Sequence, residues 1–379
     1  MSLLNSQVSG RVYGLGGRQR SLAQSLHLDI PLLVCLLALA GTSLFVLYSA
    51  SGQNMDIIER QAVRLLIGFI IMLALAQINA ATLIRWTPVI FTIGVLLLIA
   101  VLVFGETGKG AQRWLDIGIA RFQPSEIMKL AVPMMVAWYL NEQALPPKMR
   151  RLFVATLMIL VPTLLIAKQP DLGTAILVAS AGVLVLLFAG IQWQLLAGFG
   201  AMVAASAPVL WHTMHEYQRQ RVLTFLNPEQ DPLGSGYHII QSKIAIGSGG
   251  LYGKGWLNGT QSQLNFLPES STDFIFAAYA EEFGLLGIVL LLFAYLLIIV
   301  RGLLIAAQAQ DTYTRLLAGS LIMTFFIYVF VNIGMVTGLM PVVGLPLPLV
   351  SYGGTSMVTL MAGFGILMSI HTHRKLLSS

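Results

Sequence analysis

The chain has 379 residues, of which 56% are hydrophobic and only 10% are charged, and its formal net charge is +6. A soluble domain carries roughly 25% charged residues, and a globule of this size lacks the interior to bury so much apolar surface. Together with a mean hydropathy of +0.80, these values exclude a soluble enzyme, a disordered chain and a secreted scaffold. We therefore expect an all-α integral membrane protein.

Charge-free apolar intervals predict the membrane crossings, and at about 20 residues per crossing the chain has material for about ten. The predicted crossings are Ile30–Met55, Leu65–Ile84, Trp86–Gly105, Leu130–Asn141 extended by Ser125–Lys129, Leu152–Ala167, two within Leu172–His215, Phe274–Val300 as one long helix, and two within Leu316–His373. We expect a membrane domain over 30–371 between tails at 1–29 and 372–379. Basic residues in the short loops favour a cytoplasmic location for both termini.

One large loop, residues 211–272, separates the seventh and eighth predicted crossings, and we expect it outside the cytoplasm. Within it, Tyr237–Ile246 places apolar and polar residues at near-helical spacing, which predicts a short helix on the membrane surface. A plain solvated connector is the alternative. The stretch Gly247–Gly255 reads GSGGLYGKG. It departs from the phosphate-binding loop pattern at two positions, so a flexible hinge is the better interpretation.

Three other kinds of site are disfavoured by the residue pattern. The single cysteine, Cys35, permits no disulfide framework. The basic residues are scattered between apolar blocks, which argues against a nucleic-acid partner. His212 and His215 could begin a metal site with His238 nearby, but no third ligand lies at a recognisable spacing from them.

Polar residues gather at four predicted helix ends: Glu59–Arg64, Gly110–Lys129, Lys168–Thr174 and Glu269–Glu282. Ionisable groups at such positions are costly and tend to mark functional sites. Each group also has a structural interpretation. Glu126 and Lys129, three residues apart, can form an ion pair, and Asp171 or Asp273 can cap the helix that follows.

Two adjacent acids, Glu281 and Glu282, lie two turns inside the eighth predicted crossing. At 100° per residue, Glu281 is about 80° from Asp273 around a helix, so the two could face one cavity. Glu282 lies nearly opposite to Asp273 and needs another partner.

Four separated stretches resemble the SEDS family of bacterial cell-wall proteins, and its RodA branch in particular. They read RFQPSEIMK, KQPDLGT, NGTQSQLNFLPESSTDFIFAAYAEEFG and PVVGLPLPLVSYGG. The resemblance implies a peptidoglycan glycosyltransferase of the inner membrane that polymerises lipid II on the outer face during cell elongation. It also implies a class B penicillin-binding protein and other elongation proteins as partners, and Asp273 as the catalytic residue. One departure is Ser271, where the family often has histidine.

The residues fit this chemistry. A carboxylate at Asp273 would take the proton of a sugar hydroxyl, which contributes about 10²–10⁴-fold as general base catalysis. The attack displaces a pyrophosphate, whose growing charge Arg60, Arg113 and Lys129 would stabilise. Glu126 and Asp171 would orient these cations or hold Mg²⁺ or Mn²⁺, and Glu281 is a further substrate-binding candidate. We expect no organic cofactor.

Two other functions compete with the polymerase. A lipid II flippase or another polytopic transporter also uses several crossings with acids inside the bilayer. A scaffold for the elongation machinery needs no chemistry. A flippase requires a polar path through the whole membrane, whereas the polar groups of this chain cluster at helix ends near one leaflet, which favours the polymerase.

Overall fold

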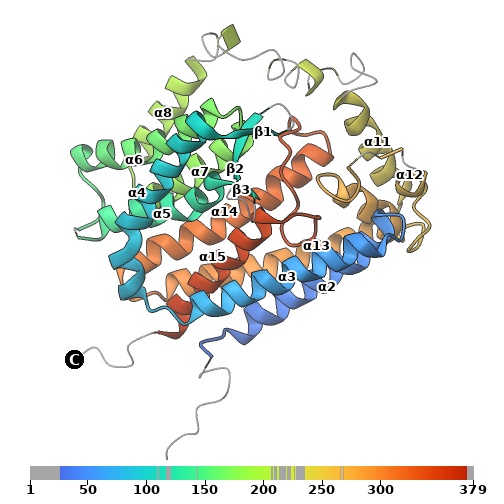
Figure 1. The fold of residues 1–379 in the computed structure, drawn as a ribbon, viewed down its shortest axis with the longest axis horizontal. Helices are drawn as coiled ribbons and strands as arrows, with labels where there is room; N and C mark the ends of the chain where they lie inside the picture. Colours follow the sequence, from blue (N-terminus) through green and yellow to red (C-terminus); the bar gives the residue numbers. More distant parts are fainter. Residues whose placement is uncertain are drawn as a thin grey trace, which may run out of the picture.

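The computed structural model describes residues 26–108, 111–116, 121–142, 144–205, 235–264 and 269–373, with isolated positions at 208, 211–212, 219, 223–225, 227 and 266–267. Parts of the predicted tails and most of 206–234, including His215, lie outside the described residues. Within them the chain is almost entirely helical (Figure 1). The predicted all-α class is therefore confirmed.

Twelve helices make up most of the described residues. Their bounds are α2 Ile30–Ala50, α3 Met55–Ala76, α4 Ala80–Phe104, α5 Pro124–Asn141, α6 Met149–Lys168, α7 Leu172–Phe188, α8 Trp193–Ala205, α11 Ser235–Ser248, α12 Thr260–Gln263, α13 Ile275–Ala307, α14 Thr312–Val336 and α15 Thr355–Thr372. Helices α2 and α3 run side by side along one edge, α13, α14 and α15 cross the middle, and α11 and α12 lie near one end (Figure 1).

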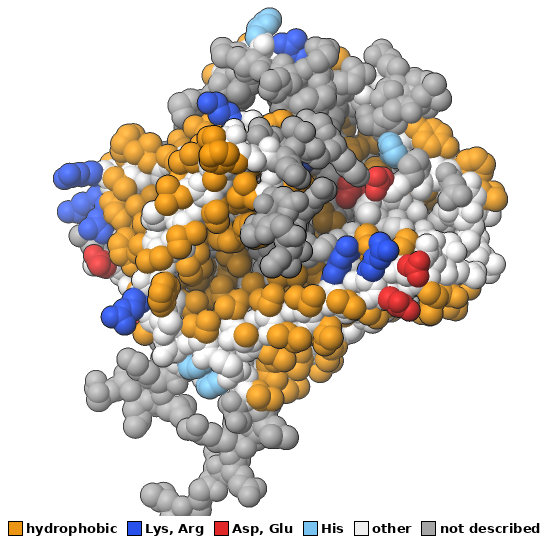
Figure 2. Space-filling model, viewed as in Figure 1, with side chains coloured by type: hydrophobic (Ala, Val, Ile, Leu, Met, Phe, Trp, Pro, Cys, Tyr) orange, Lys and Arg blue, Asp and Glu red, His pale blue; other side chains and the backbone are white. Residues whose placement is uncertain are grey.

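Six helices are long and apolar enough to cross a membrane: α2, α4, α6, α13, α14 and α15. The shorter apolar α7, together with α3, α5 and α8, occupies the remaining predicted intervals, and the count of ten stays a prediction. Large hydrophobic side chains remain exposed on these helices, such as Leu290 at 68% and Phe293 at 53%. Hydrophobic side chains cover much of one face, with charged ones in a few small groups (Figure 2). Such a surface suits lipid rather than water.

The two described ends of the chain meet, as an even number of crossings requires. The rings of His27 and His373 stack with centroids 3.9 Å apart. Beside them, Asp29 caps α2 by accepting from the Leu32 amide at 3.0 Å. The guanidinium of Arg301 on α13 bonds the same carboxylate at 2.5 Å, and His371 on α15 lies 3.2 Å from it. Asp29 therefore links α2, α13 and α15 at this end.

A small antiparallel sheet precedes α5 and was not predicted. Its strands, β1 Glu106–Gly108, β2 Ala111–Asp116 and β3 Arg121–Phe122, pair in sequence order. The chain then enters α5 through Pro124, whose ring suits the first turn of a helix. The sheet thus holds Arg113 over the start of α5.

Helix α13 is not the single continuous helix that the sequence predicts, because Gly284 interrupts it with φ 64° and ψ −161°. The stretch Gly247–Gly255 satisfies the backbone groups freed by this break. The amides of Lys254 and Gly255 donate to the carbonyls of Glu281 and Glu282, both at 3.0 Å, and the Leu285 amide donates to the Gly250 carbonyl at 2.9 Å. Backbone groups at membrane depth need such partners.

The flexible-hinge interpretation of Gly247–Gly255 is therefore wrong. Its glycines let two backbones approach more closely than any side chain would allow. A Cβ on Gly249 would lie 2.2 Å from the Ala280 carbonyl oxygen, and one on Gly253 would lie 2.0 Å from that of Glu282. The stretch is a packed part of the fold.

This packing predicts that Gly253→Ala destabilises the protein far more than Gly250→Ala. Both glycines have positive φ, 78° and 57°, but a Cβ at Gly250 meets nothing within 4 Å. Gly250→Ala should cost about 1–2 kcal/mol of backbone strain, and Gly253→Ala about 1–3 kcal/mol more for the clash. Thermal unfolding in detergent measures both. Equal melting temperatures for the two variants would contradict the packing.

The contacts of Asp29 predict a pH-dependent contribution to stability. Burial acts to raise the pKa of Asp29, but hydrogen bonds from Arg301 and the Leu32 amide, with the charges of Arg301 and His371, hold it below the ordinary 3.8. A lowered pKa stabilises the fold above the unfolded-state value and loses that effect as pH falls through the folded-state value. Asp29→Asn should cost about 2 kcal/mol at pH 7. The difference from wild type should shrink below about pH 4, and a constant difference would refute the assignment.

Candidate active site around Asp273

Asp273 lies on the turn that leads into α13 and is half-buried. It does not cap the helix. Phe274 holds the N-cap position and no side chain makes a capping hydrogen bond there. The capping interpretation of Asp273 is therefore wrong, and its carboxylate serves some other purpose.

The turn that carries Asp273 is held by three consecutive carbonyl groups. The Ser271 carbonyl accepts from the Tyr352 amide at 2.9 Å, and the Thr272 carbonyl accepts from the Ser351 hydroxyl at 2.5 Å. The Asp273 carbonyl accepts from the Asn332 side-chain amide at 2.9 Å. The backbone of Asp273 is thereby fixed against the segment that connects α14 to α15.

This segment, residues 338–354, is called the connecting loop below. It has little regular structure of its own, because its prolines and glycines prevent a helix. Four buried side chains from four helices bond its carbonyl groups. The bonds run from Ser43 to Val350, from Gln61 to Ser351, from Tyr295 to Pro348 and from Asn332 to Leu345, at 2.9, 3.1, 2.7 and 2.6 Å. A loop satisfied in this way is a rigid wall of the site.

Of the basic residues on α3, Arg64 contacts this wall and Arg60 does not reach it. The Arg64 guanidinium lies 4.3 Å from the ring centroid of Tyr352 in a cation–π contact. Arg60, the predicted ligand, is exposed one turn earlier on the same helix. The sequence pattern includes both residues. Only the way α3 packs against α15 determines which of the two arginines contacts the connecting loop.

A second polar group forms where α7 begins. Asp171 caps α7, as one of the interpretations of the sequence predicts, by accepting from the Thr174 amide at 3.2 Å. It also accepts from the Gln123 side chain at 3.1 Å and lies 3.7 Å from the Arg113 guanidinium. This end of α7 packs on the connecting loop, since a Cβ on Gly173 would lie 2.6 Å from Val343. Arg113 and Asp171 are therefore near the wall beside Asp273.

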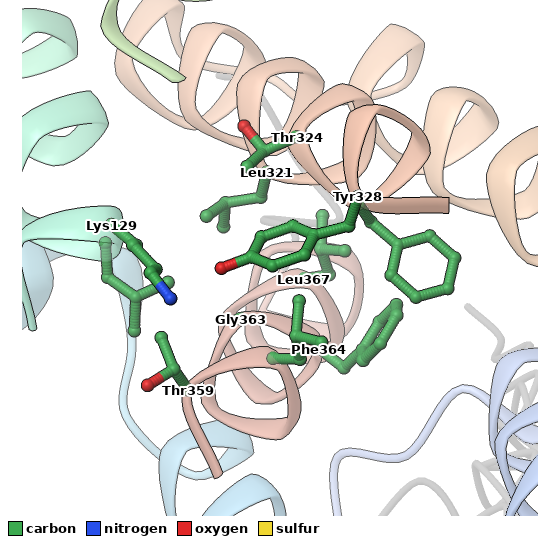
Figure 3. A pocket seen from close by; sticks show the side chains of 11 residues that line it. Lys129, Leu321, Thr324, Tyr328, Thr359, Gly363, Phe364 and Leu367 are labelled. Carbon is green, nitrogen blue, oxygen red and sulfur yellow. The ribbon is translucent and has the colours of Figure 1, made fainter. Parts of the chain in front are cut away.

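Glu126 and Lys129 form the predicted ion pair, with 2.6 Å between the ammonium and the carboxylate. Both are buried, at 6% and 5% exposed, and Lys129 also lies 5.3 Å from the Tyr328 ring centroid. The other oxygen of Glu126 has no hydrogen-bond partner among the described residues. Lys129 lines a small pocket between α5, α14 and α15, together with Thr324, Tyr328 and Thr359 (Figure 3). The two charges largely cancel within this pocket.

Glu281 does not share a cavity with Asp273. Its carboxylate is 0% exposed and is surrounded by donors from the large loop. It accepts from the Lys254 ammonium at 2.7 Å, the Thr260 hydroxyl at 2.9 Å and the Gln261 amide at 3.1 Å. The Glu281 carboxylate therefore holds residues 254–261 in place. Because it is enclosed by these donors, it does not contact a substrate directly. Glu282 finds its separate partner in Ser49 on α2.

The histidines of the large loop give no metal site among the described residues. No group of three His, Cys, Asp or Glu side chains there could hold a metal ion. His238 instead stacks on Phe274, with ring centroids 5.6 Å apart. It thereby packs α11 against the residue that follows Asp273.

The buried ion pair predicts opposite outcomes for single and double variants. Glu126→Ala leaves the Lys129 ammonium buried without its partner and should cost about 3–5 kcal/mol of stability. Glu126→Ala combined with Lys129→Met removes both charges and should restore most of it. Melting temperatures in detergent measure the difference, and a double variant as unstable as Glu126→Ala would contradict the pairing. Activity assayed in the stable double variant then reports chemistry rather than folding.

Comparisons with known proteins agree on one family. A family model described as a cell cycle protein, which covers FtsW, RodA and SpoVE, matches residues 26–376. Peptidoglycan glycosyltransferase MrdB of Escherichia coli K12 is 58% identical over 353 residues, which cover 93% of this chain and 95% of the relative. Stage V sporulation protein E of Bacillus subtilis is 35% identical, covering 92% of this chain and 98% of the relative.

Solved structures show the same fold. A chain from work on the structural coordination of polymerization and crosslinking by a peptidoglycan synthase complex superposes with a TM-score of 0.80 at 33% identity, covering 92% of this chain and 98% of the other. The rod shape determining protein RodA of Thermus thermophilus superposes with a TM-score of 0.70 at 28% identity, with 92% and 98% covered. With a membrane-type helical fold, a family model over nearly its whole length and relatives well above 30% identity, the chain belongs to the FtsW/RodA/SpoVE family, the SEDS proteins.

Proposed function

We propose that this protein is a peptidoglycan glycosyltransferase that joins lipid II units into glycan strands, with Asp273 as the general base. One observation carries the assignment of the base. Asp273 is a half-buried acid on a turn whose three carbonyls are fixed by the connecting loop and by Asn332 of α14. Catalysis by proton transfer needs a carboxylate held in a set position. The glycosyltransferase activity is supported by the 58% identity to a relative of that name.

In the proposed reaction, a sugar hydroxyl of the incoming lipid II attacks the anomeric carbon of the growing strand. A new C–O bond forms as the bond to the lipid pyrophosphate breaks, and the hydroxyl proton passes to the Asp273 carboxylate. The electrons of the broken bond leave with the pyrophosphate. A single displacement of this kind inverts the configuration at the anomeric carbon.

The leaving pyrophosphate gains negative charge, which nearby cations stabilise in the transition state. Arg113 is held by the Pro170 carbonyl at 2.5 Å and the Asp171 carboxylate beside the connecting loop. Arg64 lies on the Tyr352 ring of the same loop. We assign these two guanidiniums to the pyrophosphate. Lys129 contributes less, because the Glu126 carboxylate 2.6 Å away neutralises its charge. Arg60 is exposed, and its role is to attract the substrate as it approaches the site.

The divalent cation expected at Glu126 and Asp171 fits these residues poorly. Asp171 already accepts from Gln123 and Thr174 and faces Arg113, and Glu126 holds Lys129. One or two carboxylates with substrate phosphates suffice for Mg²⁺, but apart from the second Glu126 oxygen, which has no partner among the described residues, the oxygens of these two carboxylates already have partners. Mg²⁺ or Mn²⁺ stays a prediction, and no step above passes through it.

A membrane location with both termini in the cytoplasm and a penicillin-binding protein as partner complete the proposal. The apolar exposed helices support a multi-pass membrane protein. The meeting of His27 with His373 supports termini on one side. A structural neighbour comes from a synthase complex that coordinates polymerization and crosslinking, which supports a crosslinking partner of class B type.

If Asp273 is the general base of a polymerase, Asp273→Asn and Asp273→Ala should abolish glycan synthesis. Each removes the proton acceptor, which should lower the rate by about 10²–10⁴-fold. The purified protein with its crosslinking partner is given labelled lipid II, and polymer is resolved on gels. Asp56→Asn, which alters an exposed acid in the first turn of α3, is the matched control and should retain activity.

Polymerisation by folded Asp273→Asn would refute the base. Lipid II crossing of proteoliposome membranes that depends on Glu281 but not on Asp273 would favour the transporter instead. Binding of the partner by each variant confirms that the fold is intact.

A further inference from the structure

Gly344 in the connecting loop lies directly beside the Asp273 carboxylate. Its backbone has φ 80°, in the left-handed region that favours glycine. A Cβ built on Gly344 would have one neighbour within 4 Å among the described residues, the Asp273 Oδ2 atom at 3.5 Å. At most other packed glycines of the described chain, the missing side chain makes room for a helix backbone or an apolar side chain. Here the nearest described atom is a carboxylate oxygen.

The gap between Gly344 and Asp273 is set by a single buried side chain. Asn332 on α14 is 0% exposed. Its amide nitrogen donates to the Asp273 carbonyl at 2.9 Å and to the Leu345 carbonyl at 2.6 Å. These acceptors belong to Asp273 itself and to the residue after Gly344. The Asn332 amide therefore spans both walls of the gap.

A second contact on each side makes the gap rigid. Ser351 donates to the Thr272 carbonyl at 2.5 Å and accepts from the Leu347 amide at 2.8 Å. It thus joins the residue before Asp273 to the part of the connecting loop that follows Gly344. Two polar side chains hold the walls together, so thermal motion does not close the gap by moving the loop alone.

We propose that Gly344 is the specificity-determining residue for the acceptor hydroxyl, with Asn332 as the positioning residue that sets its distance from Asp273. This inference rests on the proposed role of Asp273 as the base. A hydroxyl oxygen must come within about 2.6–3.2 Å of the carboxylate to transfer its proton. A methyl group 3.5 Å from Oδ2 occupies the space through which a sugar hydroxyl reaches that oxygen. A bare glycine keeps this approach open to a secondary alcohol on a bulky ring.

The test compares Gly344→Ala with Gly52→Ala. Gly52 also has positive φ, 66°, and a Cβ there meets nothing within 4 Å, so Gly52→Ala reproduces the backbone strain without blocking the carboxylate. In the lipid II assay with the partner present, Gly344→Ala should lower kcat about 100-fold, toward the level of Asp273→Asn. Gly52→Ala should stay within about threefold of wild type. The melting temperatures of the two variants should be similar.

Asn332→Leu tests the positioning role and does not depend on whether Gly344→Ala folds. It removes both donated hydrogen bonds at similar volume. The acid limb of the kcat–pH profile should then move, because the surroundings of the Asp273 carboxylate change. A purely structural role would reduce the active fraction and leave the limb where it is in wild type.

The outcomes separate the two proposals. If Asp273→Asn still polymerises, the base assignment fails and this inference fails with it. If Asp273→Asn is inactive but folded Gly344→Ala matches Gly52→Ala, only the role of Gly344 fails. If Asn332→Leu loses activity with an unchanged acid limb, Asn332 is not a positioning residue.

Discussion

Every backbone group that leaves a helix inside this protein must find a partner within the protein, because lipid supplies none. This constraint shapes the two irregular regions next to Asp273. At the break in α13, the glycine stretch 247–255 bonds the exposed backbone on both sides of Gly284. On the turn before α13, the carbonyls of residues 271–273 are bonded by the connecting loop and α14. The short first part of α13 is thus anchored at both ends, and Asp273 is positioned as a consequence.

The buried charges obey the same constraint, because each needs a partner within the protein. Asp29 pairs with Arg301, Glu126 with Lys129, and Glu281 with Lys254, at 2.5, 2.6 and 2.7 Å. Breaking such a pair leaves a buried charge unbalanced, whereas the pair itself adds little net stability. The Asp29 pair lies about 30 Å from the Asp273 turn along the length of α2. Polar groups are therefore present at both ends of the bundle, contrary to the one-leaflet expectation, but at the far end they form a closed ionic link between helices.

The position of Asp273 is set through its main chain. Its backbone is fixed by neutral donors, and its carboxylate faces a glycine. A carboxylate that abstracts a proton must be held in place, and hydrogen bonds to the backbone of Asp273 achieve this. The surrounding wall is the connecting loop, which buried side chains of α2, α3, α13 and α14 hold by its carbonyl groups. This explains how an irregular, proline-rich loop can serve as a precise surface in a membrane protein.

The amino-acid sequence by itself determined the membrane class, the approximate helices, the Glu126–Lys129 pair and the cap at Asp171, because these depend on composition and on neighbours within one turn. It also placed Asp273 at a helix end and, through its motifs, in the right family. The small sheet, the break at Gly284, the enclosure of Glu281 and the contact of Arg64 with Tyr352 were decided only by tertiary structure. Each depends on which distant backbone or side chain lies opposite, and spacing along one helix carries no information about that partner. The gap between Gly344 and Asp273 is the clearest case, since 70 residues separate its walls and a third segment holds them together.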